Sequence, residues 1–154
     1  MKVVAFLQNP WFKPDTPNYI IAKYRDEPDY RRRVLALSMT GRRLMTAYGD
    51  KFSEIHWDNA NPLHGSYSSK LFREDIGHMV KALGIARPTA VVTYSKTALD
   101  GMSQILHYWD EIPEIKELQL DKPAHHHCPH PNSRGITQFQ LNEFAQIVIN
   151  RYIT

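Results

Sequence analysis

Cysteine is nearly absent from this chain, whose 154 residues include a single one, Cys128. One thiol excludes an internal disulfide and is compatible with a reducing environment. Long hydrophobic runs are absent as well. The apolar run at residues 3–7 meets polar residues and a proline before it could act as a signal sequence, and no run is long enough to span a bilayer. We therefore expect a soluble, cytoplasmic protein with no membrane partner.

The composition is not that of a disordered protein. Apolar residues make up 42% of the chain and charged residues 23%, which is ordinary for a globular protein. A chain of this length can bury enough surface to fold as one domain, over residues 1–154, without disulfides. The net charge of +3 permits binding to nucleic acid but does not by itself demonstrate it.

Strand-like and helix-like patterns alternate along the chain. Strands are predicted at residues 3–7, 52–57, 90–93 and 125–128. Helices are predicted at residues 19–24, 29–39, 40–49, 68–83, 96–106 and 137–152, with a small edge element near 115–120. This alternation predicts an α/β fold, a three-layer α/β/α sandwich around a central, mainly parallel, four-stranded sheet.

Local signals add detail to these elements. Thr40 is predicted to cap the helix that follows it, and Ser68 or Ser69 to cap the helix at residues 68–83. Several large apolar side chains are predicted to be buried: Leu37, Trp57, Met79 and Trp109.

Three polar loops follow predicted strands. They read Gln-Asn-Pro-Trp at residues 8–11, Asp-Asn-Ala-Asn-Pro at 58–62 and His-Pro-Asn-Ser-Arg at 130–134. Prolines stiffen such loops, so the neighbouring side chains are aimed reproducibly. His130 supplies a donor near neutral pH, and Arg134 supplies a planar cation suited to phosphates and base faces. Because parallel strands end at one edge of a sheet, we expect these loops to gather there and to meet an anion.

In this order, the loops resemble the three motifs of the uracil-DNA glycosylase superfamily. The resemblance is to the branches with asparagine in the first motif, the single-strand-selective monofunctional and mismatch-specific ones. The segment Thr-Gly-Arg-Arg-Leu at residues 40–44 also resembles a helix start common in the superfamily. The resemblance implies a monofunctional DNA glycosylase of base-excision repair. Such an enzyme flips uracil or another modified or deaminated base from DNA and hydrolyses its N-glycosidic bond.

The same resemblance implies roles for individual residues. Asn9 would hold the attacking water, and His130 would donate a hydrogen bond to the departing base. The remaining implied contacts are to the base, by Gln8, Trp11, Tyr19 and Asn59, and to DNA, by Arg42, Asn132, Ser133 and Arg134. The chemistry requires no cofactor, the partner is single- or double-stranded DNA, and we expect a monomer.

Departures from the family leave the excised base open. Leu7 stands where the family has glycine, and Ala22 stands where its stacking phenylalanine is expected. Tyr19 or Tyr24 would then stack on the base. Two alternative functions remain: a non-catalytic DNA-binding relative, and a hydrolase that acts on free nucleosides or modified bases.

Two further patterns have less specific interpretations. Residues 125–128 and His130 offer the ligand types that zinc prefers. Adjacent strand residues point to opposite faces, however, so three consecutive histidines cannot reach one ion, and we expect no metal. The arginine runs at residues 31–33 and 42–43 are expected to lie on solvated helix faces.

Overall fold

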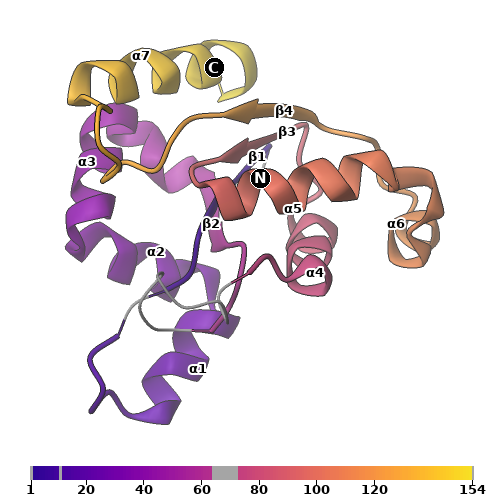
Figure 1. The fold of residues 1–154 in the computed structure, drawn as a ribbon, viewed down its shortest axis with the longest axis horizontal. Helices are drawn as coiled ribbons and strands as arrows, with labels where there is room; N and C mark the ends of the chain where they lie inside the picture. Colours follow the sequence, from indigo (N-terminus) through magenta and orange to yellow (C-terminus); the bar gives the residue numbers. More distant parts are fainter. Residues whose placement is uncertain (1, 11, 64–72, 154) are drawn as a thin grey trace.

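Four parallel strands form the central sheet, in the order β2-β1-β3-β4 (Figure 1). The computed structural model describes residues 2–10, 12–63 and 73–153. The strands are β1 (Val3–Leu7), β2 (Ile55–Asn59), β3 (Ala90–Thr93) and β4 (Ala124–His127). β1 and β3 lie in the middle of the sheet, and their continuous apolar sequence suits strands that are covered on both faces.

Helices occupy most of the remaining described chain. They are α1 (Asn18–Asp26), α2 (Pro28–Leu37), α3 (Met39–Tyr48), α4 (Ile76–Ala86), α5 (Lys96–His107), α6 (Pro113–Leu118) and α7 (Gln138–Val148). Short 3-10 helices lie at Gly49–Glu54 and Trp109–Glu111, and a π-helix lies at Ile149–Ile153.

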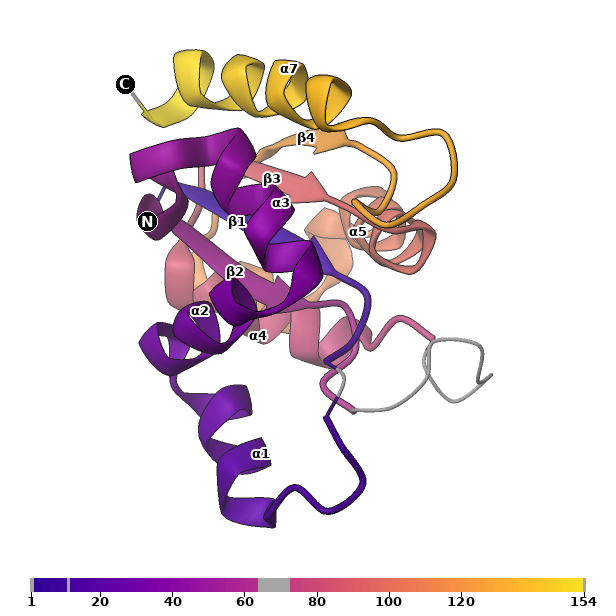
Figure 2. The ribbon, with the colours of Figure 1, turned by 90° about the vertical axis from the view of Figure 1, so that its left-hand side faces the viewer.

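Helices cover both faces of the sheet. Val3 and Ala5 of β1 pack in one core with residues of α2, α3 and α7, and α3 lies beside α7 (Figure 2). Val4 and Phe6 point the other way, into a second core with residues of α4, α5 and α6. The alternation along β1 therefore divides the interior into two cores, and the α/β sandwich expected from the sequence is confirmed.

The ends of α3 and α7 have clear sequence causes. Gly49 ends α3 at φ 58°, a conformation that glycine adopts without a steric penalty. α7 begins with a capping box, in which Thr137 and Gln140 each bond the other's backbone N–H.

Several local predictions are corrected. Ser38, not Thr40, caps α3 through a 2.9 Å bond from the Gly41 N–H. The second strand begins at Ile55, because residues 49–54 form a 3-10 helix, and residues 113–118 form a helix where an edge element was expected. Leu37 is 74% exposed, since it ends α2 and points away from the core.

The fourth helix also differs from its prediction. α4 begins at Ile76 and is capped by Asp75, while the predicted caps Ser68 and Ser69 lie outside the described residues. Met79, Trp57 and Trp109 are buried, as predicted.

Candidate functional site

A cavity of about 280 Å³ lies at the carboxyl ends of β1 and β2. All three polar loops contribute to its wall, through Gln8, Asn9, Asn59, His130 and Asn132. The other lining residues come from the connection after β1 and from helices α1 to α3, and include Phe12, Tyr24, Leu35, Met39 and Thr40. The loops that were expected to converge therefore do so, because parallel strands deliver them to one edge.

Backbone bonds hold the first two loops together. The Ala60 N–H donates to the Leu7 carbonyl at 2.7 Å, and the Asn61 N–H donates to the Gln8 carbonyl at 3.0 Å. These bonds extend the pairing of β1 and β2 beyond the strands. The Asn61 side chain is used internally, since it donates to the Arg73 carbonyl at 2.6 Å and accepts from the Leu63 N–H at 2.8 Å. Asn59 is the carboxamide of this loop that lines the cavity.

Asn59 is held by a tyrosine from α1. Its side chain is 3% exposed, and its Nδ2 donates to the Tyr24 hydroxyl at 3.2 Å. Phe12 packs edge-on against the Tyr24 ring, with ring centroids 5.2 Å apart. Burial raises the pKa of Tyr24, so the phenol is neutral at physiological pH.

His130 is neutral as well. Burial, followed by the nearby charge of Arg43, lowers the pKa of His130 to about 4. Its Nδ1 accepts the backbone N–H of Asn132 at 3.2 Å. A neutral imidazole whose Nδ1 accepts must carry its hydrogen on Nε2. His130 therefore offers one N–H donor beside the cavity that it lines.

Helices α3 and α7 support the loop that carries His130. Asn132 donates from Nδ2 to the Thr40 hydroxyl at 2.8 Å, which joins the loop to the first turn of α3. Arg43 donates to the Ile136 carbonyl at 3.3 Å and to Gln138 at 3.4 Å. Arg43 thus braces this loop from within the protein.

A buried ionic cluster lies on the other face of β2. Asp58 is 3.1 Å from Arg31 and 2.9 Å from His78, while His56 lies 3.8 Å away. Burial by itself would raise the pKa of Asp58, yet the neighbouring His56, His78 and Arg31 hold this pKa well below its usual range. Asp58 Oδ1 also accepts the Asn59 N–H at 2.7 Å, so the cluster fixes the backbone that carries Asn59.

The prediction that the arginines at residues 31–33 all lie on a solvated helix face is wrong for Arg31. Arg31 is 3% exposed and reaches from α2 to Asp58. Arg43 also departs from the prediction, since it is partly buried and bonds Ile136 and Gln138, whereas Arg33 and Arg42 are exposed as expected. The burial of Arg31 could have been predicted from the sequence. Arg31 is four residues before the buried Leu35, which places it about one helical turn away on the same face.

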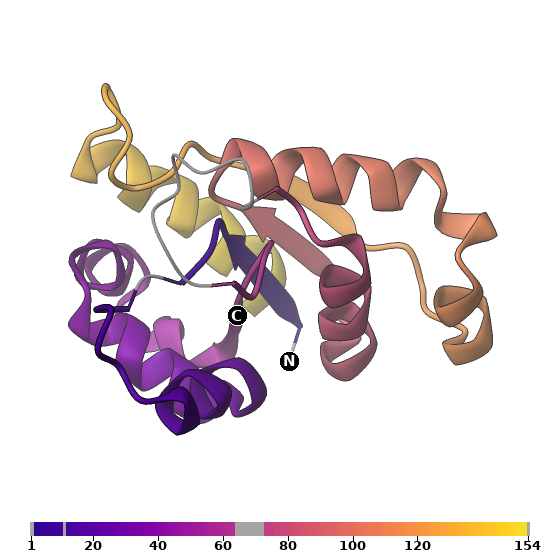
Figure 3. The same ribbon diagram turned by 60° about the horizontal axis from the view of Figure 1, so that its bottom comes forward.

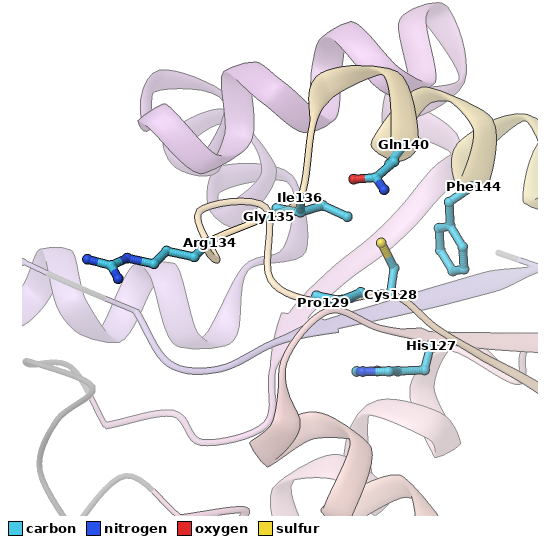
Figure 4. A pocket seen from close by; sticks show the side chains of 8 residues that line it. All are labelled: His127, Cys128, Pro129, Arg134, Gly135, Ile136, Gln140 and Phe144. Carbon is cyan, nitrogen blue, oxygen red and sulfur yellow. The ribbon is translucent and has the colours of Figure 1, made fainter.

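The residues assigned to DNA contact lie on the surface. Arg42, Asn132, Ser133 and Arg134 are all exposed. Figure 4 shows the Arg134 side chain extending away from the other residues around a neighbouring cavity of about 430 Å³. The Cys128 sulfur faces that cavity, and burial raises its pKa to about 11, so the thiol stays protonated.

Tyr19, one of the residues assigned to the base, is not part of the described cavity wall. Tyr19 is 71% exposed and is not among the residues that line the cavity, in contrast to Tyr24 on the same helix. Trp11 lies outside the described residues. Tyr24 is therefore the tyrosine of α1 that lines the cavity.

The consecutive histidines alternate between faces, as predicted. His125 and His127 both contact the Thr93 hydroxyl, at 3.0 and 2.9 Å, while His126 meets the Tyr152 hydroxyl at 2.6 Å. Among the residues described here, no three His, Cys, Asp or Glu side chains are arranged to hold a metal ion. The described helices include none that is long and apolar enough to cross a membrane.

Acidic side chains gather far from the cavity. Asp110, Glu111, Glu114 and Glu117 lie in or near α6, which is at the opposite end of the molecule from α3 and the loop after β4 (Figures 1 and 3). The elements that carry Arg42 and Arg134 are therefore remote from this acidic group.

Comparison of the chain with protein-family models, with curated proteins and with solved structures finds no match.

Proposed function

We propose that this protein is a monofunctional DNA glycosylase, which binds a base flipped from DNA and hydrolyses its N-glycosidic bond. The observation that carries the proposal is the meeting of Asn9, Asn59 and His130 in one cavity. These are the residues that the resemblance assigned to the water, the base edge and the leaving group. They come from three loops that are far apart in the sequence.

The geometry supports a separate role for His130 in the reaction. Water attacks the sugar carbon, the carbon–nitrogen bond breaks, and the base leaves with the bonding electrons. The proton that the water loses ends on the departed base. Negative charge then builds on the base acceptor next to the broken bond, which is a carbonyl oxygen in uracil and a ring nitrogen in hypoxanthine. The neutral Nε2–H of His130 stabilises this charge as a preorganised donor, an interaction worth about 2.7 to 4 kcal/mol in comparable oxyanion sites.

The cavity suits a small planar ligand. Its volume of about 280 Å³ is near the lower end for ligand sites, so it favours a single base over a whole nucleotide. The monofunctional reaction is hydrolysis, which forms no Schiff base to the sugar.

Base release from labelled DNA tests the proposal. End-labelled single- and double-stranded oligonucleotides would each carry one uracil, hypoxanthine or 5-substituted pyrimidine, and alkali would cleave at any abasic site formed. Cleavage at one modified base by the wild type, but not by a His130→Ala protein, establishes the glycosylase. Binding without release of any base would overturn it in favour of the non-catalytic relative.

A parallel assay separates the nucleoside alternative. Free deoxyuridine and deoxyinosine would be incubated with the protein, and the released base measured by chromatography. The glycosylase proposal predicts DNA binding that weakens steeply with salt, because phosphate contacts release counterions. Rapid release from free nucleosides, with DNA binding that is weak and insensitive to salt, would contradict it.

A further inference from the structure

Tyr24 is the one buried residue of α1, all of which the structure describes. It is 7% exposed, lines the cavity and follows Tyr19 by about one and a half turns of helix, which places the two tyrosines on different faces. The edge-on contact with Phe12 limits rotation of the Tyr24 ring. The hydroxyl is therefore held at a defined point in the cavity wall.

The hydrogen bond with Asn59 determines what this hydroxyl can offer. Asn59 Nδ2 donates to the Tyr24 oxygen at 3.2 Å, so the phenolic hydrogen is not used in that bond. Nothing else in the described part of the chain accepts that hydrogen or donates to Asn59 Oδ1. A phenol has one hydrogen to donate, and a carboxamide oxygen accepts. The raised pKa keeps Tyr24 protonated across the physiological range.

We propose that Tyr24 determines base specificity together with Asn59, an inference that rests on the proposed glycosylase function. The Tyr24 O–H donates to a carbonyl on the base, and Asn59 Oδ1 accepts the neighbouring ring N–H. The carbonyl is the one remote from the glycosidic bond, because the proposed function assigns the atom next to that bond to His130.

This donor and acceptor pair selects a chemical class. It fits bases in which a carbonyl stands beside a ring N–H, such as uracil and hypoxanthine. Cytosine and adenine present an amino donor where those bases present the carbonyl. Their amino group would face the Tyr24 hydroxyl hydrogen, which leaves buried groups unpaired and gives strong rejection.

Replacement of the carbonyl oxygen by sulfur tests the hydroxyl directly. Wild type, Tyr24→Phe and Tyr19→Phe would be compared in single-turnover release of a base and its thiocarbonyl counterpart. The pairs are uracil with 4-thiouracil and hypoxanthine with 6-thiohypoxanthine, in the same oligonucleotide. Sulfur accepts hydrogen bonds weakly but leaves the ring N–H in place. Tyr19→Phe is the matched control, because it removes an exposed hydroxyl from the same helix.

We expect Tyr24→Phe to release the oxygen base at least about tenfold more slowly than wild type, since one hydrogen bond is lost. Its preference for oxygen over sulfur should largely disappear, while Tyr19→Phe keeps both the rate and the preference. A Tyr24→Phe protein with the full wild-type rate and preference would overturn the role of Tyr24 alone. A wild type without preference for oxygen would also overturn it, even if the variant failed to fold. No release by wild type from any oligonucleotide would overturn the glycosylase function itself.

Discussion

The Nδ1 atom of His130 accepts the backbone N–H of Asn132 at 3.2 Å, so the orientation of the imidazole is set by its own loop. Buried Pro131 stands between the two residues and restricts the backbone that makes this contact. The Asn132 side chain then ties the same loop to Thr40 at 2.8 Å. The donor that the proposed reaction needs is therefore held before any substrate arrives.

Loss of the His130 donor should slow base release without weakening DNA binding. We expect His130→Ala to reduce the single-turnover rate by roughly 10²- to 10³-fold, as for other oxyanion donors. His130→Asn keeps an N–H donor and should lose less. Rates and DNA dissociation constants would be measured on the same oligonucleotide. Full activity in the alanine variant would remove His130 from the mechanism.

The lowered pKa of His130 should appear in the pH dependence of base release. The ring stays neutral down to about pH 4, so the rate should not decline near the ordinary histidine value of 6.5. Protonation below that point places a hydrogen on Nδ1, against the Asn132 N–H. A rate profile between pH 4 and 8 checks this, and an acid limb centred at pH 6 to 7 would contradict it.

Stability should follow the same titration. Because the unfolded state binds the proton first, His130 favours folding above pH 6.5, and this contribution is lost as pH falls towards 4. Chemical unfolding across this range should show a falling free energy of unfolding, and His130→Asn should reduce the slope. His125, His126 and His127 also have lowered pKa values and contribute in the same direction, so the slope should be reduced and not abolished.

Arg134 should contribute to DNA binding through charge. We expect Arg134→Ala to weaken binding and to lower the slope of log affinity against log salt by about 1, the value for one lost phosphate contact. Lys116→Ala in α6 is the matched control, since it removes one exposed positive charge from the far end of the molecule. Equal salt slopes in the two variants would show that Arg134 makes no phosphate contact with DNA.

The buried ion pair of Arg31 and Asp58 should contribute more to the free energy of unfolding than the exposed pair of Arg32 and Asp29. Arg31→Met leaves a buried carboxylate without its cation, which costs about 3 to 5 kcal/mol. Arg32→Met breaks an exposed pair with Asp29 and should cost at most about 1 kcal/mol. Denaturant unfolding of both variants gives the comparison. Similar losses in the two variants would argue against a buried ion pair.

Gly41 should tolerate no side chain. A Cβ there would lie 1.7 Å from the Leu35 carbonyl oxygen, so α2 and α3 would have to separate. Gly41→Ala should therefore destabilise the protein by about 1 to 3 kcal/mol or more. Gly77→Ala in α4 meets its nearest atom at 3.6 Å, and should stabilise the helix by about 0.5 to 1 kcal/mol. Thermal unfolding of the two variants should show a lower melting temperature for Gly41→Ala and a higher one for Gly77→Ala, relative to wild type.

The fold was largely predictable from the sequence. Apolar runs such as Val3–Leu7 identify buried strands without reference to their neighbours, and their alternation with helices dictates a parallel sheet. Parallel strands must end at one edge, so the meeting of Asn9, Asn59 and His130 also followed from the order of elements. Both inferences depend on local pattern and topology, which a single chain contains.

The partners of individual polar side chains depended on the tertiary structure. Tyr19 and Tyr24 are equivalent as residue types, and only the packing of α1 against the cavity buries the second. Arg31 differs from Arg32 and Arg33 only in helical phase, and its burial requires Asp58 and His78 to arrive from β2 and α4. Such contacts join residues distant in the chain. The sequence by itself determined the sheet and the edge where the loops meet, whereas the three-dimensional packing decided which side chains face the cavity and in which protonation state.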